Sequence, residues 1–322
     1  MIKNYFKIAW RQLLQNKGLS FINIFGLAIG MAFSILIGLW VKYETSFDNF
    51  QVNKDRIALV MRNGINNDQK ETSVATSLPL FKELKASYPE VKRASRIDWG
   101  NNHSLIVGDK KLNKQGFYVD PDFLKMFSFP LIKGNINKAL NDPNSIVLTE
   151  TLAQILFGSQ NPIGKVISLD NQFNVMVSGI VQDAPKNSDF KFEFLAPFEF
   201  KVQNEAFVKN AINEWDNNFL MNVVELKEGT DMAGFSKKIG PLSKKKANIS
   251  GQILFLHPFK KWHLYDDYKD WINTGGKIEI IRLLGILGVF VLLIACINFM
   301  NLSTARSEKR AKEVGIRKSV GS

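Results

Sequence analysis

Two long runs of apolar residues interrupt an otherwise mixed pattern of hydrophobic and polar positions. The first run, Leu19–Val41, holds 23 residues without one charged side chain. The second, Leu283–Met300, holds 18, and its apolar pattern extends a few residues upstream. A helix needs about 20 apolar residues to cross the hydrocarbon core of a membrane. The pattern therefore predicts transmembrane helices over residues 19–43 and 278–304.

The first run is predicted to be a retained anchor and not a cleaved signal peptide. A signal peptide has an apolar region of about 7–15 residues, followed by small residues at its cleavage site. The run here is longer, and the aromatic and charged stretch Trp40-Val-Lys-Tyr-Glu44 follows it.

Between the two predicted spans, residues 44–277 alternate short β-like runs with helix-like ones. Near the start of the segment, a helix-like run over 78–88 lies between strand-like runs over 56–62 and 91–99. The same order recurs near the end, where a helix lies between strand-like runs over 220–226 and 252–257. This second helix carries four apolar residues on one face: Met232, Phe235, Ile239 and Leu242. Two βαβ-sized units so far apart predict one α+β subdomain built from both ends of the segment. The middle, about 100–215, is predicted to be an inserted β-rich subdomain. The predicted fold class is thus an α+β extracytoplasmic domain between two transmembrane α-helices.

The formal net charge of +12 and the mean hydropathy of −0.07 look like those of a basic soluble protein. However, residues 1–41 carry four basic residues and no acidic ones, and residues 305–322 carry six basic against two acidic. The remaining 263 residues carry 32 basic and 28 acidic ones. Positive flanks stay on the cytoplasmic side, so both termini are predicted to be cytoplasmic and the large domain periplasmic. A nearly neutral large domain also excludes nucleic acid as a partner.

No constellation of residues predicts catalysis, a metal or a cofactor. The single cysteine, Cys296, excludes a disulfide framework and a Cys-rich metal site. His257 and His263 lie six residues apart, and we interpret them as scattered surface polar residues rather than zinc ligands. Residues 158–166 depart from a phosphate-binding loop in spacing and carry Val166 in place of Ser or Thr, so a turn between a helix and a strand is the better interpretation.

Four small residues recur every four positions along the first span: Gly26, Gly30, Ser34 and Gly38. Small residues at this spacing let another helix approach closely, so the stripe predicts a helix-packing face. Residues 1–18 combine apolar residues at helical spacing with Lys3, Lys7 and Arg11 between them, which predicts an amphipathic helix on the cytoplasmic lipid surface.

Several segments resemble the FtsX-like, MacB-type ABC transporter permeases, particularly the long forms of Bacteroidetes. They are, in chain order, Phe6-Lys-Ile-Ala-Trp-Arg-Gln-Leu-Leu-Gln-Asn-Lys-Gly18, Gly26-Leu-Ala-Ile-Gly30, Tyr118-Val-Asp-Pro-Asp-Phe-Leu-Lys-Met-Phe-Ser-Phe-Pro130, Leu156-Phe-Gly158, Asn161-Pro-Ile-Gly-Lys165 and Lys312-Glu-Val-Gly-Ile-Arg-Lys-Ser-Val-Gly321. The similarity covers essentially the whole chain in the family's order.

The resemblance implies a non-catalytic permease subunit in the cell inner membrane, with a MacB-like periplasmic core domain of porter-like and inserted parts. It implies a permease dimer, a separate cytoplasmic ABC ATPase, and a periplasmic adaptor or outer-membrane partner. The segment 305–322 would be the cytoplasmic coupling segment, with Glu313, Gly315, Arg317 and Lys318 contacting the ATPase. Family members have at least four spans, so the resemblance implies that this chain corresponds to an N-terminal portion.

Two other functions remain open from the sequence. A two-span membrane sensor with an extracytoplasmic ligand-binding domain would share the topology, but it needs a heptad-bearing linker after the second span. Residues 306–322 are charged and show hardly any such apolar pattern. A membrane-tethered hydrolase would need a nucleophile paired with a base, and the sequence offers no such pair.

Overall fold

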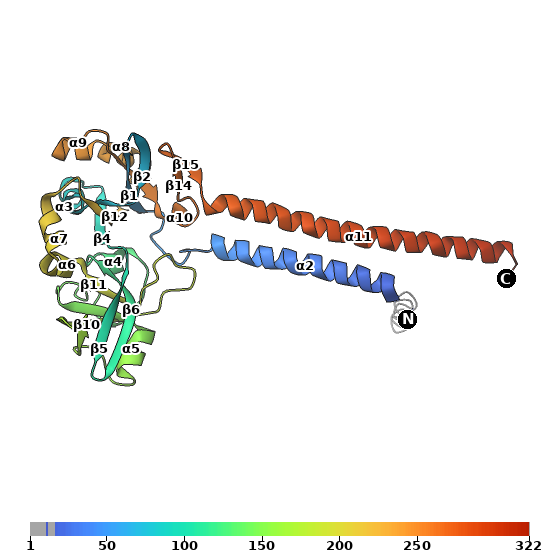
Figure 1. Cartoon of the computed structure of the whole chain (residues 1–322), viewed down its shortest axis with the longest axis horizontal. Helices are drawn as coiled ribbons and strands as arrows, with labels where there is room; N and C mark the ends of the chain where they lie inside the picture. The colour runs from blue at the N-terminus through green and yellow to red at the C-terminus, as the bar shows by residue number, and fades with distance from the viewer. Residues whose placement is uncertain (1–10, 12–16, 322) are drawn as a thin grey trace. The chain divides into compact units, whose positions relative to one another are not determined.

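The computed structural model describes residue 11 and residues 17–321, and these fall into two compact units. One unit contains the two long helices at the ends of the chain, and the other contains residues 46–276 (Figure 1). The predicted amphipathic helix over residues 1–18 lies almost wholly outside the described residues.

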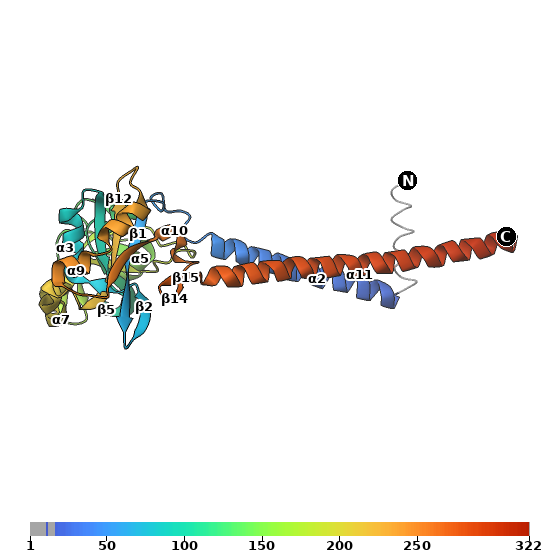
Figure 2. The same cartoon turned by 90° about the horizontal axis from the view of Figure 1, so that it is seen from above.

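The helical unit consists of α2 (Lys17–Thr45) and α11 (Lys277–Ser319), which run side by side in both views (Figures 1 and 2). The parts long and apolar enough to cross a membrane are Ser20–Thr45 and Lys277–Asn301. Their large apolar side chains, such as Leu36 and Ile294, are more than half exposed. Such exposure is expected of helices whose surroundings are lipid.

The domain of residues 46–276 begins and ends in a four-stranded sheet. Its strands lie in the order β13 (Ile253–Pro258), β1 (Ile57–Asn66), β12 (Asn218–Leu226) and β4 (Val91–Ile97), each antiparallel to its neighbour. Strands β1 and β4 are therefore parallel and are joined through α3 (Leu78–Ser87), while β12 and β13 are parallel and are joined through α8 (Met232–Ile239) and α9 (Leu242–Ala247). This split βαβ arrangement confirms the predicted α+β subdomain made from both ends of the segment.

The helices of this subdomain follow local sequence signals, with one departure from the prediction. Helix α3 ends before Pro89, and the side chain of Asp231 caps α8 by accepting hydrogen bonds from the amides of Ala233 and Gly234, each 3.0 Å long. Leu242 was predicted on the same helix as Met232, but the helix is interrupted at Gly240-Pro241 and Leu242 starts α9. Proline starts a helix readily but cannot continue one, which explains the break.

The inserted segment forms a closed barrel. Six strands pair in the ring β6–β11–β8–β10–β9–β5, which then returns to β6; they are β5 (Asn101–Val107), β6 (Lys110–Val119), β8 (Ser145–Thr149), β9 (Val166–Leu169), β10 (Phe173–Val181) and β11 (Phe194–Pro197). The parallel pairing of β6 with β11 closes the ring. A closed ring leaves no exposed sheet edge and encloses its own apolar core.

The remaining elements are short and cover these two sheets. They are β2 (Gln69–Ser73), β3 (Thr76–Ser77), β7 (Leu131–Gly134), β14 (Asp267–Lys269), β15 (Ile272–Gly275), α4 (Phe123–Met126), α5 (Glu150–Phe157), α6 (Phe198–Asn204), α7 (Ala206–Asn210), a 3-10 helix (Ala211–Asn213) and α10 (Phe259–Trp262).

The four-stranded sheet is packed on both faces. Its side chains Ala58, Val60 and Val224 pack against α3, α8 and α9, whereas Leu59 and Val223 on the opposite face join an aromatic cluster. This cluster includes Phe123, Phe127, Phe129, Phe190, Phe192 and Phe259. It fills the space beside the barrel, whose link to the sheet is the single strand pair Ile97–Val119. The boundaries of about 100 and 215 given to the insertion stay a prediction.

Candidate functional site

Small residues bring α2 and α11 close together. A methyl group placed on Gly30 would come within 2.5 Å of the Cβ of Ala295, so only glycine fits there without a shift of the helices. The hydroxyl of Ser34 lies 2.9 Å from the carbonyl oxygens of both Gly30 and Gly288 and can donate to either. Small residues thus allow backbone contact between the helices, and a hydrogen bond supports it.

The other two glycines of the predicted stripe differ from each other. A Cβ on Gly26 would lie 3.5 Å from the Nδ2 atom of Asn298, whereas a Cβ on Gly38 would have no neighbour within 4 Å. Each residue turns a helix by about 100°, so a four-residue repeat moves Gly38 about 120° away from Gly26. The structure therefore does not bring Gly38 to this contact, and Ile37 packs against Gly288 instead.

The predicted coupling segment continues α11 without a break as far as Ser319. Gly315, Arg317 and Lys318 lie in this last part and are exposed. Glu313 falls within the helix, but its side chain lies outside the described part of the structure. No described atom comes within 4 Å of where a Cβ on Gly315 would stand. The contact of these residues with an ATPase stays a prediction.

Directly after the first long helix, a buried carboxylate fastens the chain to a distant loop. The amide of Asp48 donates to the carbonyl of Asn187 over 2.9 Å. Its carboxylate accepts hydrogen bonds from the Ser188 hydroxyl at 3.0 Å and the Asp189 amide at 3.2 Å. Burial and then the charge of Asp189 raise the pKa of Asp48 to about 6. Asp48 also has a left-handed backbone, with φ of 53°.

A histidine also contacts this acidic pair. The Nδ1 atom of His263 lies 2.7 Å from the carboxylate of Asp189, and its ring stacks on Phe47. His263 is thus not the surface residue that was predicted, since only 9% of its side chain is exposed. The cluster of Asp48, Asp189 and His263 had no sequence signal, because its members are up to 215 positions apart.

The other two histidines also have side-chain partners within hydrogen-bond distance. His257 is buried, contrary to the prediction of a surface residue, and its Nδ1 atom lies 2.7 Å from the Tyr268 hydroxyl. Burial lowers the pKa of His257. His103 contacts the carboxylate of Asp170 at 2.6 Å. Within residue 11 and residues 17–321, no group of three or more His, Cys, Asp or Glu side chains could hold a metal ion.

A buried ion pair lies where the four-stranded sheet meets the barrel. Arg96 forms two hydrogen bonds through its guanidinium to the Asp120 carboxylate, at 2.6 and 2.9 Å. The guanidinium also lies between the rings of Phe81 and Phe198, 4.5 Å from each ring centre. Nearby, Lys201 pairs with Asp98. These contacts fix the orientation of the barrel on the sheet, and they were not predicted from sequence patterns.

Comparison with protein families finds one match over most of the chain. A model described as the MacB-like periplasmic core domain matches residues 20–242. These residues include most of the first long helix, the barrel and three strands of the four-stranded sheet.

Two curated relatives match nearly the whole chain, and both are described as macrolide export ATP-binding/permease protein MacB. The protein of Wolinella succinogenes is 23% identical over 335 aligned positions, which cover 98% of this chain and 47% of the relative. The protein of Bdellovibrio bacteriovorus is 22% identical over 327 positions, which cover 97% of this chain and 48% of the relative. The chain thus spans about half the length of these relatives.

Among solved structures, a similar fold is found in a crystallised domain from Porphyromonas gingivalis, provisionally described as part of a permease protein. It superposes with a TM-score of 0.55 at 22% sequence identity, over 65% of this chain and 92% of that chain. At this identity the likeness concerns the fold alone.

Proposed function

The chain belongs to the MacB-like periplasmic core domain family, and from this premise we propose that it is a transmembrane permease subunit of an ABC transporter system. In this proposal the subunit relays motion from a separate cytoplasmic ATPase to its periplasmic domain and catalyses no reaction itself. The motion drives export of a substrate.

The observation that carries this proposal is the continuity of α11. The helix has 43 residues, which at 1.5 Å per residue makes it about 65 Å long. The hydrocarbon core of a membrane is only about 30 Å thick, so one rigid element reaches from the domain side of the second span well beyond its far side. A push on the terminal segment can therefore be transmitted along the helix axis.

The charge of the terminal segment supports contact with a cytoplasmic protein. Residues 305–322 carry six basic and two acidic side chains, and residues 1–41 carry four basic ones and no acidic ones. We infer from these flanks that both termini are cytoplasmic. Gly315 supports the same contact, because a mid-helix glycine costs about 1 kcal/mol relative to alanine and nothing described in this structure touches it. A partner backbone approaching this position would explain the glycine.

The same proposal includes a second copy of the permease and a periplasmic or outer-membrane partner. The helix-packing face made by Gly26, Gly30 and Ser34 is occupied by α11 of the same chain. We therefore assign this face to pairing of the two spans within one subunit, and Gly38 is free to serve contacts with another helix.

Co-purification with an ABC ATPase tests the proposal. The full chain, tagged and co-expressed with the ATPase encoded in its genomic neighbourhood, is expected to retain the ATPase. Reversing the charges of Glu313 and Arg317 should reduce the recovered ATPase by about tenfold or more, since like charges across an interface repel.

Glu308→Lys is the matched control, because it reverses a charge on the same helix but on a face turned by about 140° from Glu313. It should leave the ATPase bound. Equal recovery with the Glu313 and Arg317 variants and with the unmodified chain would contradict the assignment of the coupling segment.

A further inference from the structure

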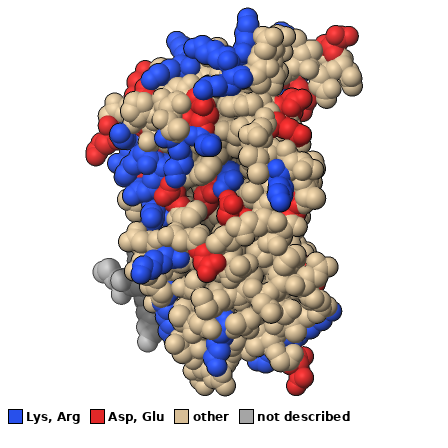
Figure 3. Space-filling model, turned by 90° about the vertical axis from the view of Figure 1, so that its left-hand side faces the viewer, with Lys and Arg blue, Asp and Glu red and all other residues tan. Residues whose placement is uncertain are grey.

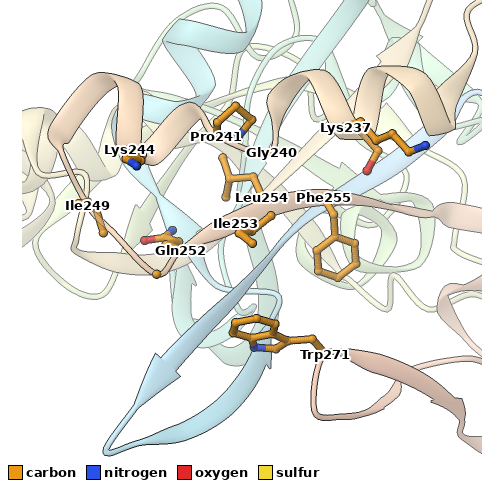
Figure 4. Close-up of a pocket in the computed structure, with 12 residues that line it drawn as sticks. Lys237, Gly240, Pro241, Lys244, Ile249, Gln252, Ile253, Leu254, Phe255 and Trp271 are labelled. Carbon is orange, nitrogen blue, oxygen red and sulfur yellow. The ribbon is translucent and has the colours of Figure 1, made fainter.

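A groove crosses the outer edge of the four-stranded sheet at β13. It has a volume of about 530 Å³ and an almost entirely apolar lining. In Figure 4, Pro241 and Lys244 lie on the helical side of β13, whereas Phe255 and Trp271 lie on the opposite side, next to the β1–β2 hairpin. The groove thus joins parts of α8, α9, β13 and the β14–β15 turn.

Trp271 forms one wall and is held firmly in place. It occupies the tight turn between β14 and β15 with a left-handed φ of 71°, which is unusual for a tryptophan. Its indole N–H donates to the carbonyl of Gly64 over 3.0 Å, and the Lys70 ammonium lies 5.1 Å from its ring centre. Across the groove, the side chain of Ile253 is 47% exposed. A fixed aromatic wall facing an exposed aliphatic side chain is typical of an interface anchor.

The backbone of β13 is not available for strand pairing. On the side away from β1, the amide of Leu254 donates to the carbonyl of Gly240 at 3.1 Å, and the amide of Leu256 donates to the Ser236 hydroxyl at 2.9 Å. The groove therefore offers apolar side chains to a ligand and not a sheet edge.

The surface around the groove is strongly basic. Segments 78–93 and 227–246 contain ten Lys and Arg against four Asp and Glu, whereas the rest of residues 46–276 contains 19 basic and 22 acidic residues. In Figure 3, blue side chains gather in the half of the domain that holds α3 and α9. Lys238 and Lys246 are paired with Glu90 and Glu83.

Lysines on α8 and α9 are left for a partner. Lys237, Lys244 and Lys245 are exposed, and none has an acidic partner within ion-pair distance in the described part of the chain. Lys237 and Lys244 line the groove itself. Apolar contact and uncompensated positive charge therefore occur at the same place.

We propose that this groove docks an acidic segment of a partner polypeptide, with an apolar side chain between Ile253 and Trp271 and carboxylates on Lys237 and Lys244. A polypeptide fits better than a small molecule, because the groove is open to solvent whereas a small-molecule site encloses most of its ligand. The basic area also extends beyond the groove. A wide area of positive charge attracts an acidic protein over a longer distance than the groove alone would.

The docking of an acidic segment rests on the proposed function in one respect, which is that the partner is extracytoplasmic. It is tested without ATPase or nucleotide, so its failure is distinct from failure of the coupling segment. The full chain is placed in phosphatidylcholine nanodiscs, and the probe is a short fluorescein-labelled peptide alternating Glu with Leu and Phe. Fluorescence anisotropy is expected to show saturable binding that weakens as salt rises.

Variants of the chain locate the binding. The Lys237→Glu, Lys244→Glu double variant should raise Kd by about tenfold or more, through like-charge repulsion with the peptide. Ile253→Ser should also weaken binding severalfold, and since Ile253 is half-exposed this change leaves the fold intact. The matched control is Lys111→Glu with Lys138→Glu, which makes the same charge change at exposed positions outside the basic segments and should leave Kd unchanged.

A second peptide, with Ser in place of every Leu and Phe, keeps the charge and removes the apolar contact. It should bind at least about tenfold more weakly, because only the carboxylates remain to interact. Equal binding of the two peptides, equal effects of the two lysine pairs, or no binding at low salt would each overturn the proposal.

Discussion

Each of the two units of the molecule is held together internally by a different kind of contact. The long helices meet through Gly30, Ser34 and Ala295, where close backbone approach replaces large side chains. In the domain, the barrel and the four-stranded sheet are joined by a cluster of Phe side chains and by the Arg96–Asp120 ion pair, which is nearly buried. Contacts between small residues tolerate sliding better than contacts between large interdigitated side chains do. Buried ion pairs and aromatic clusters do not tolerate sliding, so the domain is expected to move as a rigid body.

The strongest test of a rigid domain removes its buried ion pair. Arg96→Ala leaves the Asp120 carboxylate buried without its partner, which costs about 3–5 kcal/mol. For a domain of this size, about 1 kcal/mol corresponds to 2–4 °C, so its melting temperature should fall by about 6–20 °C. Differential scanning calorimetry of the full chain in nanodiscs measures this shift.

Lys114→Ala is the control for Arg96, because it also removes a salt bridge, with Glu193, but one that is more exposed to solvent than the Arg96–Asp120 pair. Its effect should stay below about 1 kcal/mol. If the two variants have the same melting temperature, the Arg96–Asp120 ion pair does not hold the barrel to the sheet.

The helix pair is tested by filling its closest contact. Gly30→Leu forces a side chain into Ala295, and overpacking of this kind costs about 1–3 kcal/mol. The distance between spin labels at Leu39 and Leu287 should increase and broaden in electron resonance measurements. Gly38→Leu makes the same change on the same helix where no neighbour lies within 4 Å, so it should leave that distance unchanged. An increase with both variants would show that the contact does not depend on this face.

The last expected effect concerns Asp48, near the start of the domain, and depends on pH. Asp48 has a pKa of about 6 in the folded domain against 3.8 for an ordinary aspartate, so the folded state binds a proton more tightly. Stability is therefore expected to fall as pH rises from about 4 to 6 and then to level off. Asn resembles the protonated carboxyl group and tolerates the left-handed φ, so Asp48→Asn should remove this dependence.

A shift from 3.8 to about 6 corresponds to at most about 3 kcal/mol at pH 7.5, with the Asn variant the more stable one. Melting curves between pH 4 and 8 measure it. The opposite slope, with stability rising over this range, would mean that Asp48 is stabilised by ionisation and that the acidic pair does not repel.

Sequence patterns predicted the secondary-structure elements better than the tertiary contacts between them. The absence of charge between Leu19 and Val41 was enough to predict a span, and the repeated strand–helix–strand order was enough to predict the split subdomain. Closure of the barrel was not predictable in this way, because it depends on β6 pairing with β11 across a separation of 78 residues in register. Local periodicity carries no information about such a pairing.

The candidate sites follow the same rule. Gly30 and Ser34 could be recognised from their spacing, whereas Gly38 had the right spacing but is turned away by the geometry of the helix. The burial of His257 and His263 was missed because their partners, Tyr268 and Asp189, are hydrogen-bonded through tertiary folding. Charge counts gave no sign that Lys237 and Lys244 flank a groove.

Closure of the barrel has a consequence for how such domains are modified. A closed ring has no free strand edge, and most of its core lies within one continuous stretch of the chain. Side chains from outside residues 101–197 complete this core: Leu78, Phe198, Phe200, Val208 and Leu220. The rest of the domain meets it through the Ile97–Val119 strand pair, the ion pairs near it and the aromatic cluster at its side. Residues 101–197 can therefore be exchanged between related proteins as one cassette, provided these contacts are kept, and the sheet that connects to both long helices need not be redesigned.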